Sequence, residues 1–420
     1  MYWIEIRRSP LLWCLPVLLV VDLAAVFGRS QYWIGIWPQA SAAAQIPALF
    51  FAPAFAAAAA WAVGRTLRRG IEERYRAAAR PQWHMEALQF LATATYGLGV
   101  YAVGALAAAV VSIPDAGPGF LWPSYLLLGG AVILGCSAIG HVVGRYSRSM
   151  VAAPVICGLA CFVAIGGVGS PRNLGLYALS GDPGIEISWK ALAARIFLAF
   201  ALTLAAIFTP GSFGRKAGGW GSAGRRVPAM GAVFSIILGG VLLLTSGALR
   251  VDRDAPHTPL CSQGSPRVCI WPENRKYLPQ ISAMAERIGA IPQSWIRTPA
   301  TFYELGVRPV GNGTANDFSV SEGNLWFAAP NMAGSVIQLS IPIRCESLSP
   351  QVANEVSTAM AQVEMWLEFR AMGTSEEPSV NSSMPRSDLD AAQRIAGSSE
   401  KEQDTWVKKR LKVIQEAPCA

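Results

Sequence analysis

Seven long apolar stretches dominate the first 249 residues of this 420-residue chain. Each has close to the roughly 20 residues that an α-helix needs to cross the hydrocarbon core of a bilayer. They cover residues 10–28, 44–64, 88–112, 122–144, 149–168, 189–209 and 227–248. These stretches predict a polytopic α-helical membrane protein with seven transmembrane helices.

The charged residues support a membrane assignment and indicate an orientation. They make up only 15% of the chain, against about a quarter in soluble domains, so the net charge of +8 does not indicate a nucleic-acid binder. Of the 18 basic residues before position 250, 14 fall in loops that share one side if all seven stretches span. Because basic residues stay cytoplasmic, we expect a multi-pass protein of the cell membrane with a cytoplasmic N-terminus.

Residues 250–420 differ in composition and predict a separate extracellular domain, with the membrane domain at 1–249. Strand character marks 266–271, 324–329 and 335–343, whereas 274–289, 350–373 and 400–415 have helical character. Residues 375–387 have the composition of a loop. We therefore expect a C-terminal extracytoplasmic α+β domain.

The four cysteines of this outer domain predict disulfides. Outside the cell disulfides persist, and an even number fits two bridges, although four cysteines permit three pairings. Cys261 and Cys269 flank a turn-prone sequence, so we expect them to pair, which leaves Cys345 for Cys419. The alternative, a zinc site, lacks the usual ligand spacing.

Motifs for catalysis are absent from the sequence. It has no phosphate-binding loop, no H-E-x-x-H and no G-x-S-x-G motif, and its only histidines are His84, His141 and His257. We therefore expect no enzyme and no cofactor bound by this chain.

Two features inside the predicted spans bear on packing. Asp22 and Arg195 lie at similar depths, about 9 Å below the outer boundary of the membrane. We therefore predict that they form an intramembrane charged pair. The alternative is that each side chain reaches the membrane interface separately. Gly140 and Gly144 form a G-x-x-x-G pattern, which allows close helix approach.

The loop after the second stretch predicts an amphipathic helix over 65–80. Leu67, Ile71 and Tyr75 share a stripe, and Arg69 and Glu72 are spaced for ion pairs with residues four positions later. One interpretation is a surface helix whose arginines only fix topology. The other is a coupling helix that docks on a cytoplasmic ATPase.

This loop and its surroundings resemble the actinobacterial permease-like proteins of type-two ATP-binding-cassette (ABC) exporters. The resemblance covers residues 4–19, 31–41 and 50–73, and continues through 268–273, the helix around Trp366 and 403–419. It implies a permease-like subunit with no cofactor of its own, ATP being bound by a separate ABC ATPase subunit, and a second membrane subunit in a homo- or heterodimer. Such permeases usually have six spans, whereas here a seventh leads to the outer domain.

The leading hypothesis is therefore export of a hydrophobic or amphiphilic substrate, driven by that ATPase. Lipids, amphiphilic peptides and hydrophobic antibiotics all fit, and the sequence does not choose among them. The alternative is a membrane-anchored sensor or assembly scaffold whose outer domain binds a ligand or a protein partner. An extracytoplasmic enzyme would require a catalytic group that the sequence does not present.

Overall fold

The computed structural model of the protein describes residues 2–68, 82–147, 149–170, 174–208, 223–308, 317–320, 325, 328–341, 349–373 and 385–417. The chain is mostly helical and divides into two compact units. The first holds Met1–Asp115, Gly119–Gly181 and Ile185–Val251, and the second holds Ala116–Pro118, Asp182–Gly184 and Asp252–Ala420.

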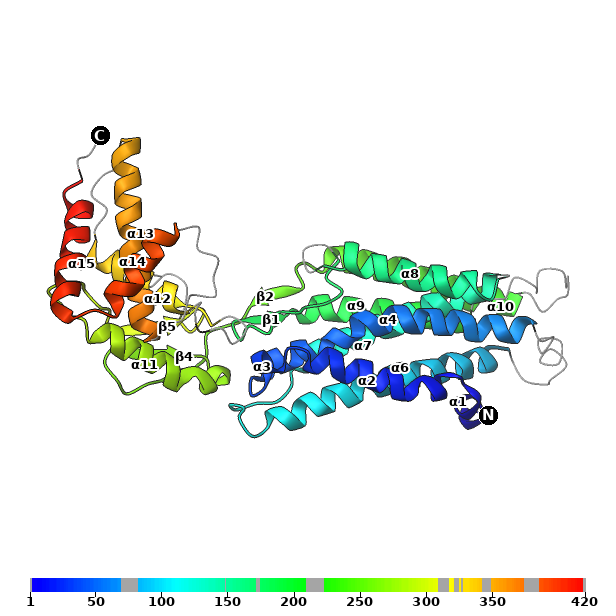
Figure 1. Ribbon diagram of the computed structural model, residues 1–420. Helices are drawn as coiled ribbons and strands as arrows, with labels where there is room; N and C mark the ends of the chain where they lie inside the picture. The colour runs from blue at the N-terminus through cyan, green and yellow to red at the C-terminus, as the bar shows by residue number, and fades with distance from the viewer. Residues whose placement is uncertain are drawn as a thin grey trace. The chain divides into compact units, whose positions relative to one another are not determined.

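The first unit is a bundle of long helices that run side by side (Figure 1). Its helices are α1 (Tyr2–Arg8), α2 (Leu11–Phe27), α3 (Ser30–Trp33), α4 (Trp37–Arg68), α6 (Gln82–Ser112), α7 (Pro123–Tyr146), α8 (Ala152–Gly167), α9 (Trp189–Phe208) and α10 (Ala223–Thr245). Two short strands, β1 (Ile185–Ile187) and β2 (Arg250–Asp252), pair with each other.

Within the described residues, four helices are long and apolar enough to cross a membrane: α4, α6, α7 and α9. The pair α1 and α2, bent by 70°, adds a fifth if it is counted as one span. Helix α8 and the apolar part of α10, Val233–Thr245, are shorter. Each predicted stretch thus contains a helix, and the structure supports four or five of them as candidate spans.

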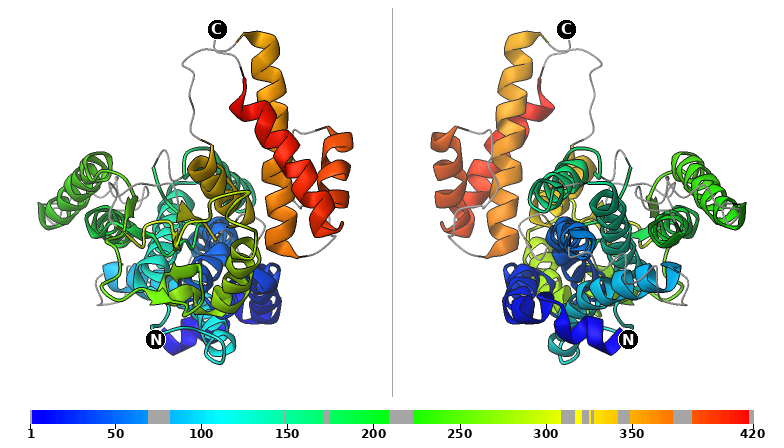
Figure 2. Two further views of the ribbon diagram at one scale, coloured as in Figure 1. Left: turned by 90° about the vertical axis from the view of Figure 1, so that its left-hand side faces the viewer. Right: turned by 90° about the vertical axis from the view of Figure 1, so that its right-hand side faces the viewer.

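The core of the bundle is built on α4, which packs against α2, α6, α7 and α8. Figure 2 views this bundle along its helices. A Cβ on Gly140 or Gly144 of α7 would collide with the backbone of α4 at Ala56 or Ala60. The G-x-x-x-G pattern therefore brings these two helices into direct backbone contact.

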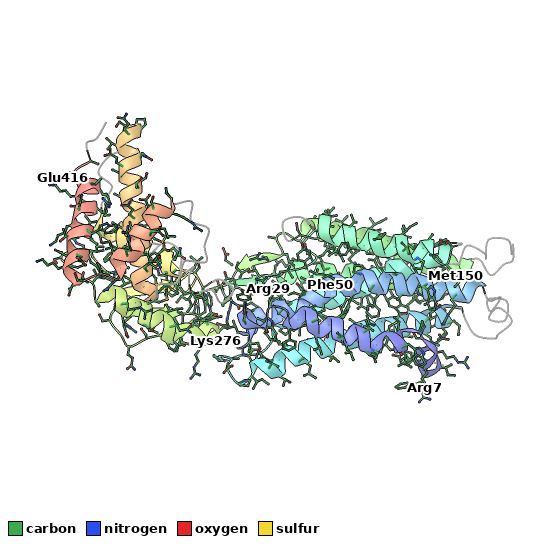
Figure 3. All side chains as sticks on the ribbon, viewed as in Figure 1. Arg7, Arg29, Phe50, Met150, Lys276 and Glu416 are labelled. Atoms are coloured by element: carbon green, nitrogen blue, oxygen red, sulfur yellow. A yellow bond between two sulfur atoms is a disulfide. The ribbon has the colours of Figure 1, made fainter. Side chains whose placement is uncertain are left out.

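The two ends of the bundle differ. Arg7 and Met150 lie at one end, which we call the basic end, and Arg29 lies at the opposite end (Figure 3). Helices α4, α7 and α9 finish at the basic end, and α6 and α10 begin there (Figure 1).

The second unit combines a four-stranded sheet with helices. The strands are β3 (Leu260–Cys261), β4 (Arg267–Ile270), β5 (Thr301–Glu304) and β6 (Asp317–Phe318), in that order. β3 and β4 are antiparallel, and the other two pairings are parallel. The helices are η3 (Pro272–Tyr277), α11 (Leu278–Gly289), α12 (Ala328–Ser340), α13 (Pro350–Met372), α14 (Arg386–Ala396) and α15 (Glu400–Gln415).

Sequence signals explain several of these boundaries. α15 begins with a capping box, in which Ser399 and Glu402 satisfy each other's backbone N–H groups. α13 ends at Met372 and is capped by Gly373, whose φ of 67° suits a residue without a side chain.

The strand predicted over 335–343 is wrong, because α12 covers it up to Ser340. The buried residues of α12 include Met332, Val336 and Ile337, which recur at helical spacing. Val336 and Ile337 had indicated a strand only because β-branched residues are common in strands. Ala328 and Ala329, predicted to end a strand, begin the same helix. The strand at 266–271 and the helices at 274–289, 350–373 and 400–415 are confirmed to within a few residues. Most of the loop predicted over 375–387 lies outside the described residues.

Candidate functional site

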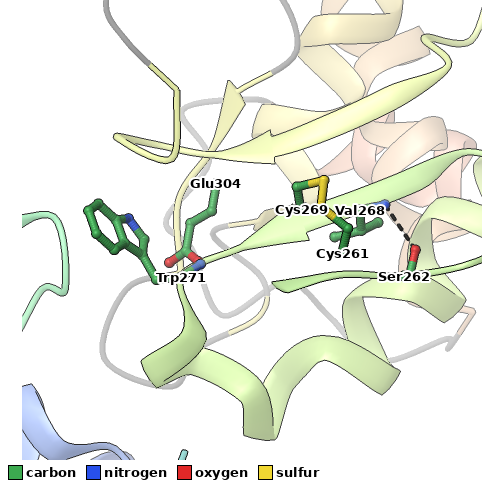
Figure 4. Close-up of a disulfide and its surroundings, with 6 residues drawn as sticks. All are labelled: Cys261, Ser262, Val268, Cys269, Trp271 and Glu304. Atoms are coloured by element: carbon green, nitrogen blue, oxygen red, sulfur yellow. Dashed lines mark hydrogen bonds between the residues drawn. A yellow bond between two sulfur atoms is a disulfide. The ribbon is translucent and has the colours of Figure 1, made fainter. Parts of the chain in front are cut away.

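The predicted bridge between Cys261 and Cys269 is confirmed. The two residues face each other across the antiparallel strands β3 and β4, with their Cα atoms 4.1 Å apart (Figure 4). Ser262 supports the same hairpin, because its hydroxyl accepts the N–H of Val268 at 3.0 Å. Cys345 and Cys419 lie outside the described residues, so their pairing stays a prediction.

Next to this hairpin, the carboxyl group of Glu304 joins three elements of the outer domain. It accepts the backbone N–H of Trp271 at 2.9 Å and the side-chain amide of Asn274 at 2.5 Å. The Trp271 indole in turn donates to the carbonyl of Leu305 at 2.9 Å. Burial raises the pKa of Glu304 to about 8, although the two hydrogen bonds oppose the shift. The buried carboxyl group of Glu304 thus links β5 to Trp271 and to η3.

The predicted coupling helix falls largely on residues that the structure leaves undescribed. Leu67 lies in the last turn of α4, which ends at Arg68. Arg69, Ile71, Glu72 and Tyr75 lie outside the described residues. The coupling helix therefore stays a prediction.

The predicted pair of Asp22 and Arg195 is not formed. The guanidinium of Arg195 donates instead to the carbonyls of Gly175 at 2.7 Å, Leu174 at 2.6 Å and Ala191 at 2.6 Å. Equal depth did not make the two residues neighbours, because α2 packs against α6 and α4 whereas α9 packs against α7, α10 and α6. Arg195 thus fixes the loop at Leu174 and Gly175 to the first two turns of α9.

Asp22 is fully buried in contact with α6. Its carboxylate occupies the space that a side chain at Gly104 would fill. Neither oxygen has a hydrogen-bond partner in the described part of the chain. Glycine at 104 is therefore what admits the acidic side chain between the two helices.

A second set of ionisable residues, which the sequence interpretation missed, lies near the basic end. We call Glu86, His141 and Arg145 the Glu86 cluster. One carboxylate oxygen of Glu86 lies 2.9 Å from His141 Nε2, and the other lies 2.9 Å from Arg145 Nη2. The side chains of His141 and Arg145 are only 1% and 4% exposed, so both are removed from solvent and lipid.

Three helix ends position the Glu86 cluster. Glu86 lies in the second turn of α6, and His141 and Arg145 lie one turn apart at the end of α7. Arg145 also donates to the carbonyl of Ala206 on α9 at 3.4 Å. The ring of Phe90 meets His141 edge-on, with centroids 5.9 Å apart. The cluster therefore ties α6, α7 and α9 together within an apolar setting.

The chemistry of the Glu86 cluster is electrostatic. A single carboxylate, 16% exposed, holds a permanent cation and an imidazole that are both buried, so the charges compensate one another. Ionisable groups at membrane depth are costly and are kept when they pair and serve a pathway or a switch. Such a joint holds three helix ends together.

The sequence contained a signal for this cluster. The predicted spans 88–112 and 122–144 leave Glu86 and Arg145 just outside, and Arg145 belongs to the loop residues that indicate orientation. His141 and Arg145 are four residues apart and so lie on one face of a helix, and Glu86 lies at a similar depth next to another predicted span. Together these positions indicate the cluster.

Comparisons with known proteins concern the outer domain. Residues 268–417, about a third of the chain, match the family described as a domain of unknown function (DUF7224). No curated protein and no solved structure matches the chain.

Proposed function

We propose that this chain is the membrane-spanning, permease-like subunit of an ABC export system. The observation that carries the proposal is the Glu86 cluster, a buried ionic joint at the basic end of three packed helices. It lies one turn after the start of α6, the helix that follows the arginine-rich segment 69–81. A force applied to that segment would therefore reach the joint directly.

The orientation belongs to the same proposal. The basic end is cytoplasmic, because Arg7 lies there and the loops that carry most of the basic residues connect there. The short helix α1, with Tyr2, Trp3 and two arginines, has the composition of an interfacial helix on that side. The outer domain is then extracellular, where the Cys261–Cys269 disulfide persists. All seven apolar stretches span in this arrangement.

In the proposed mechanism, a cytoplasmic ABC ATPase binds ATP and closes against the 65–80 segment. Closure shifts the start of α6 and alters the Glu86 cluster, which changes how α6, α7 and α9 pack at the basic end. With a second membrane subunit, identical or related, these movements expose a path alternately to the two sides of the membrane. The substrate is hydrophobic or amphiphilic.

Purification of the tagged full-length chain from its native membrane in a mild detergent tests the proposal. We expect an ATPase with a phosphate-binding loop to copurify in comparable amount. Copurification of a kinase or a transcription regulator, with no ATPase, would contradict export and favour the sensor or scaffold hypothesis.

A further inference from the structure

Asp22 is a buried acidic residue that the proposed export mechanism does not use. It lies in α2, five residues before the end of that helix, which is about 8 Å along the helix axis. Its side chain is 0% exposed, whereas Val20, Val21 and Leu23 beside it are exposed. The acidic group therefore faces the interior of the bundle, and its apolar neighbours face outward.

The contact between α2 and α6 encloses this side chain. The two helices pack side by side (Figure 1). A Cβ on Gly104 of α6 would overlap both carboxyl oxygens of Asp22. The acidic group therefore lies directly against the backbone of α6, at a position that only a glycine leaves open.

No group in the described part of the chain compensates a negative charge on Asp22. Neither of its oxygens has a hydrogen-bond partner, and none of the ion pairs among the described residues includes it. Tyr101 shares the Gly104 face of α6, but its hydroxyl donates to the carbonyl of Leu126 at 3.3 Å. An ionised Asp22 would thus be buried without a partner.

The charged residues of the helices around Asp22 lie elsewhere. Arg65 and Arg68, the only charged residues of α4, lie in its last turn at the basic end, where α1 also lies. On α6, Glu86 is about 27 Å from Gly104 along the helix axis. Arg29 follows the end of α2, and its guanidinium lies over an aromatic ring at 5.2 Å. Each of these charges has its own place in the structure.

An unpaired carboxylate in such surroundings is costly, whereas a carboxylic acid carries no charge. We propose that Asp22 is a proton-binding site at the contact between α2 and α6. It holds a proton while the two helices are in contact and releases the proton to water when they part. Separation of α2 from α6 is thereby linked to the release of one proton. The inference rests on the burial of Asp22 and does not depend on coupling to an ATPase.

Infrared spectroscopy of the full chain in lipid vesicles tests this site, because a protonated carboxyl group has a carbonyl band that a carboxylate lacks. We expect the spectrum of wild type minus that of Asp22→Asn to contain one such band at pH 7. Glu304 and Glu368 of the outer domain absorb in the same region, but both proteins contain them and the subtraction removes their bands. Overnight transfer to D2O should shift the band, since the bound proton exchanges with water.

Two glycine variants test whether the α2–α6 contact holds the proton. Gly104→Ala places a Cβ where the acidic group lies, so the side chain is displaced and the band at pH 7 should be lost. The matched control is Gly99→Ala on the same helix, where a Cβ would meet nothing within 4 Å, and it should keep the wild-type band. Elution as a single species and a cooperative melting transition confirm that each variant is folded. If Gly104→Ala does not fold, the Asp22→Asn difference decides.

A wild-type difference spectrum with no protonated carboxyl band at pH 7 would overturn the proposal, because Asp22 would then be ionised. A band that D2O leaves unshifted, or one that folded Gly104→Ala retains in full, would also overturn it. Either failure leaves the proposed export function standing. Absence of a copurifying ATPase leaves the proton site standing.

Discussion

At the scale of single residues, the Glu86 cluster makes the most direct prediction about stability. Removing one partner of a buried ion pair leaves the other charge uncompensated, so Glu86→Gln and Arg145→Gln should each lower the free energy of unfolding by about 3 kcal/mol. The double variant should cost clearly less than the two single variants together. Denaturant unfolding in detergent measures this, with Arg8→Gln on exposed α1 as control. Strictly additive losses would show that the two side chains do not act together.

Glu304 predicts how the stability of the outer domain depends on pH. Its pKa is about 8 in the folded domain, against 4.5 for an ordinary glutamate. Between these values the folded state binds more protons than the unfolded state, so the free energy of unfolding falls as the pH rises. The stabilisation is fully present below about pH 4.5 and is lost as the pH rises through 8. At 1.36 kcal/mol per pKa unit, the change is at most about 5 kcal/mol.

This pH dependence can be measured by denaturant titration of the full chain between pH 5 and pH 9. Proteolysis of the outer domain reports its unfolding. Glu304→Gln keeps an acceptor for Trp271 and should flatten the pH dependence. Glu368, whose pKa is raised to about 8 by burial and by the nearby Glu364, contributes in the same direction and leaves a residual slope. Stability that increases toward pH 9 in the wild type would contradict the role of Glu304.

Residue-level contacts were the least predictable part of the molecule. The depth of a residue within a span can be counted from the sequence, and by that count Asp22 and Arg195 lie at the same depth. Which helices are neighbours depends on packing, and Gly104, whose missing side chain admits Asp22, is one of 40 glycines in the sequence. Glu86 was missed for a related reason, because a carboxylate next to a predicted span reads as part of a loop.

At the scale of elements, the outer domain predicts its second disulfide. Val352 near the start of α13 lines the same hollow as Val413 in the last turn of α15 and Ala417 just after that helix. The chain therefore leaves toward Cys345 and toward Cys419 from adjacent places. Non-reducing peptide mapping should give a 345–419 crosslink beside the 261–269 crosslink. A 261–345 or 261–419 crosslink would contradict this pairing.

The Cys261–Cys269 bridge also has an expected energetic contribution. It closes a loop between residues eight positions apart. Because the crosslink lowers the chain entropy of the unfolded state, it should stabilise the folded domain by about 2–3 kcal/mol. Cys261→Ser with Cys269→Ser should lower the free energy of unfolding of the outer domain by that amount, measured by the same proteolytic titration. An unchanged midpoint would show that the β3–β4 hairpin is held without it.

Elements were predicted well where length and periodicity agreed. The long apolar stretches and the regularly spaced 350–373 segment are helices, as expected. The error at 335–343 came from residue type, since Val336 and Ile337 favour strands intrinsically whereas burial on one face of α12 determined the outcome. The helix α14 was not predicted, although Leu389, Ala392 and Ile395 recur at helical spacing, because its 11 residues are few and mostly polar.

At the scale of the whole molecule, the orientation gives a clear test. Alkaline phosphatase, which is active only outside the cytoplasm, should be inactive when fused at residues 75 and 220 and active when fused after residue 260. The reason is that the basic residues of the first unit gather in loops at one end. Activity at residue 220 would show that one of the six stretches before it does not span, and α8 would be the first candidate because it is short.

The division into a helical unit and an α+β unit follows from composition, because apolar stretches and charged sequence separate near residue 250. The sequence does not show that Ala116–Pro118 and Asp182–Gly184 belong to the second unit, since nothing in their composition sets them apart.

The central claim is that this chain couples a separate ATPase to movement within the membrane, and ATP hydrolysis in a reconstituted membrane tests it most directly. The copurified ATPase is assayed alone, with the wild-type chain, and with the Ile71→Asp, Tyr75→Asp double variant. We predict that the wild-type chain changes the hydrolysis rate several-fold and that the variant, inserted to the same level, does not. A rate that is the same with and without the wild-type chain would contradict the account.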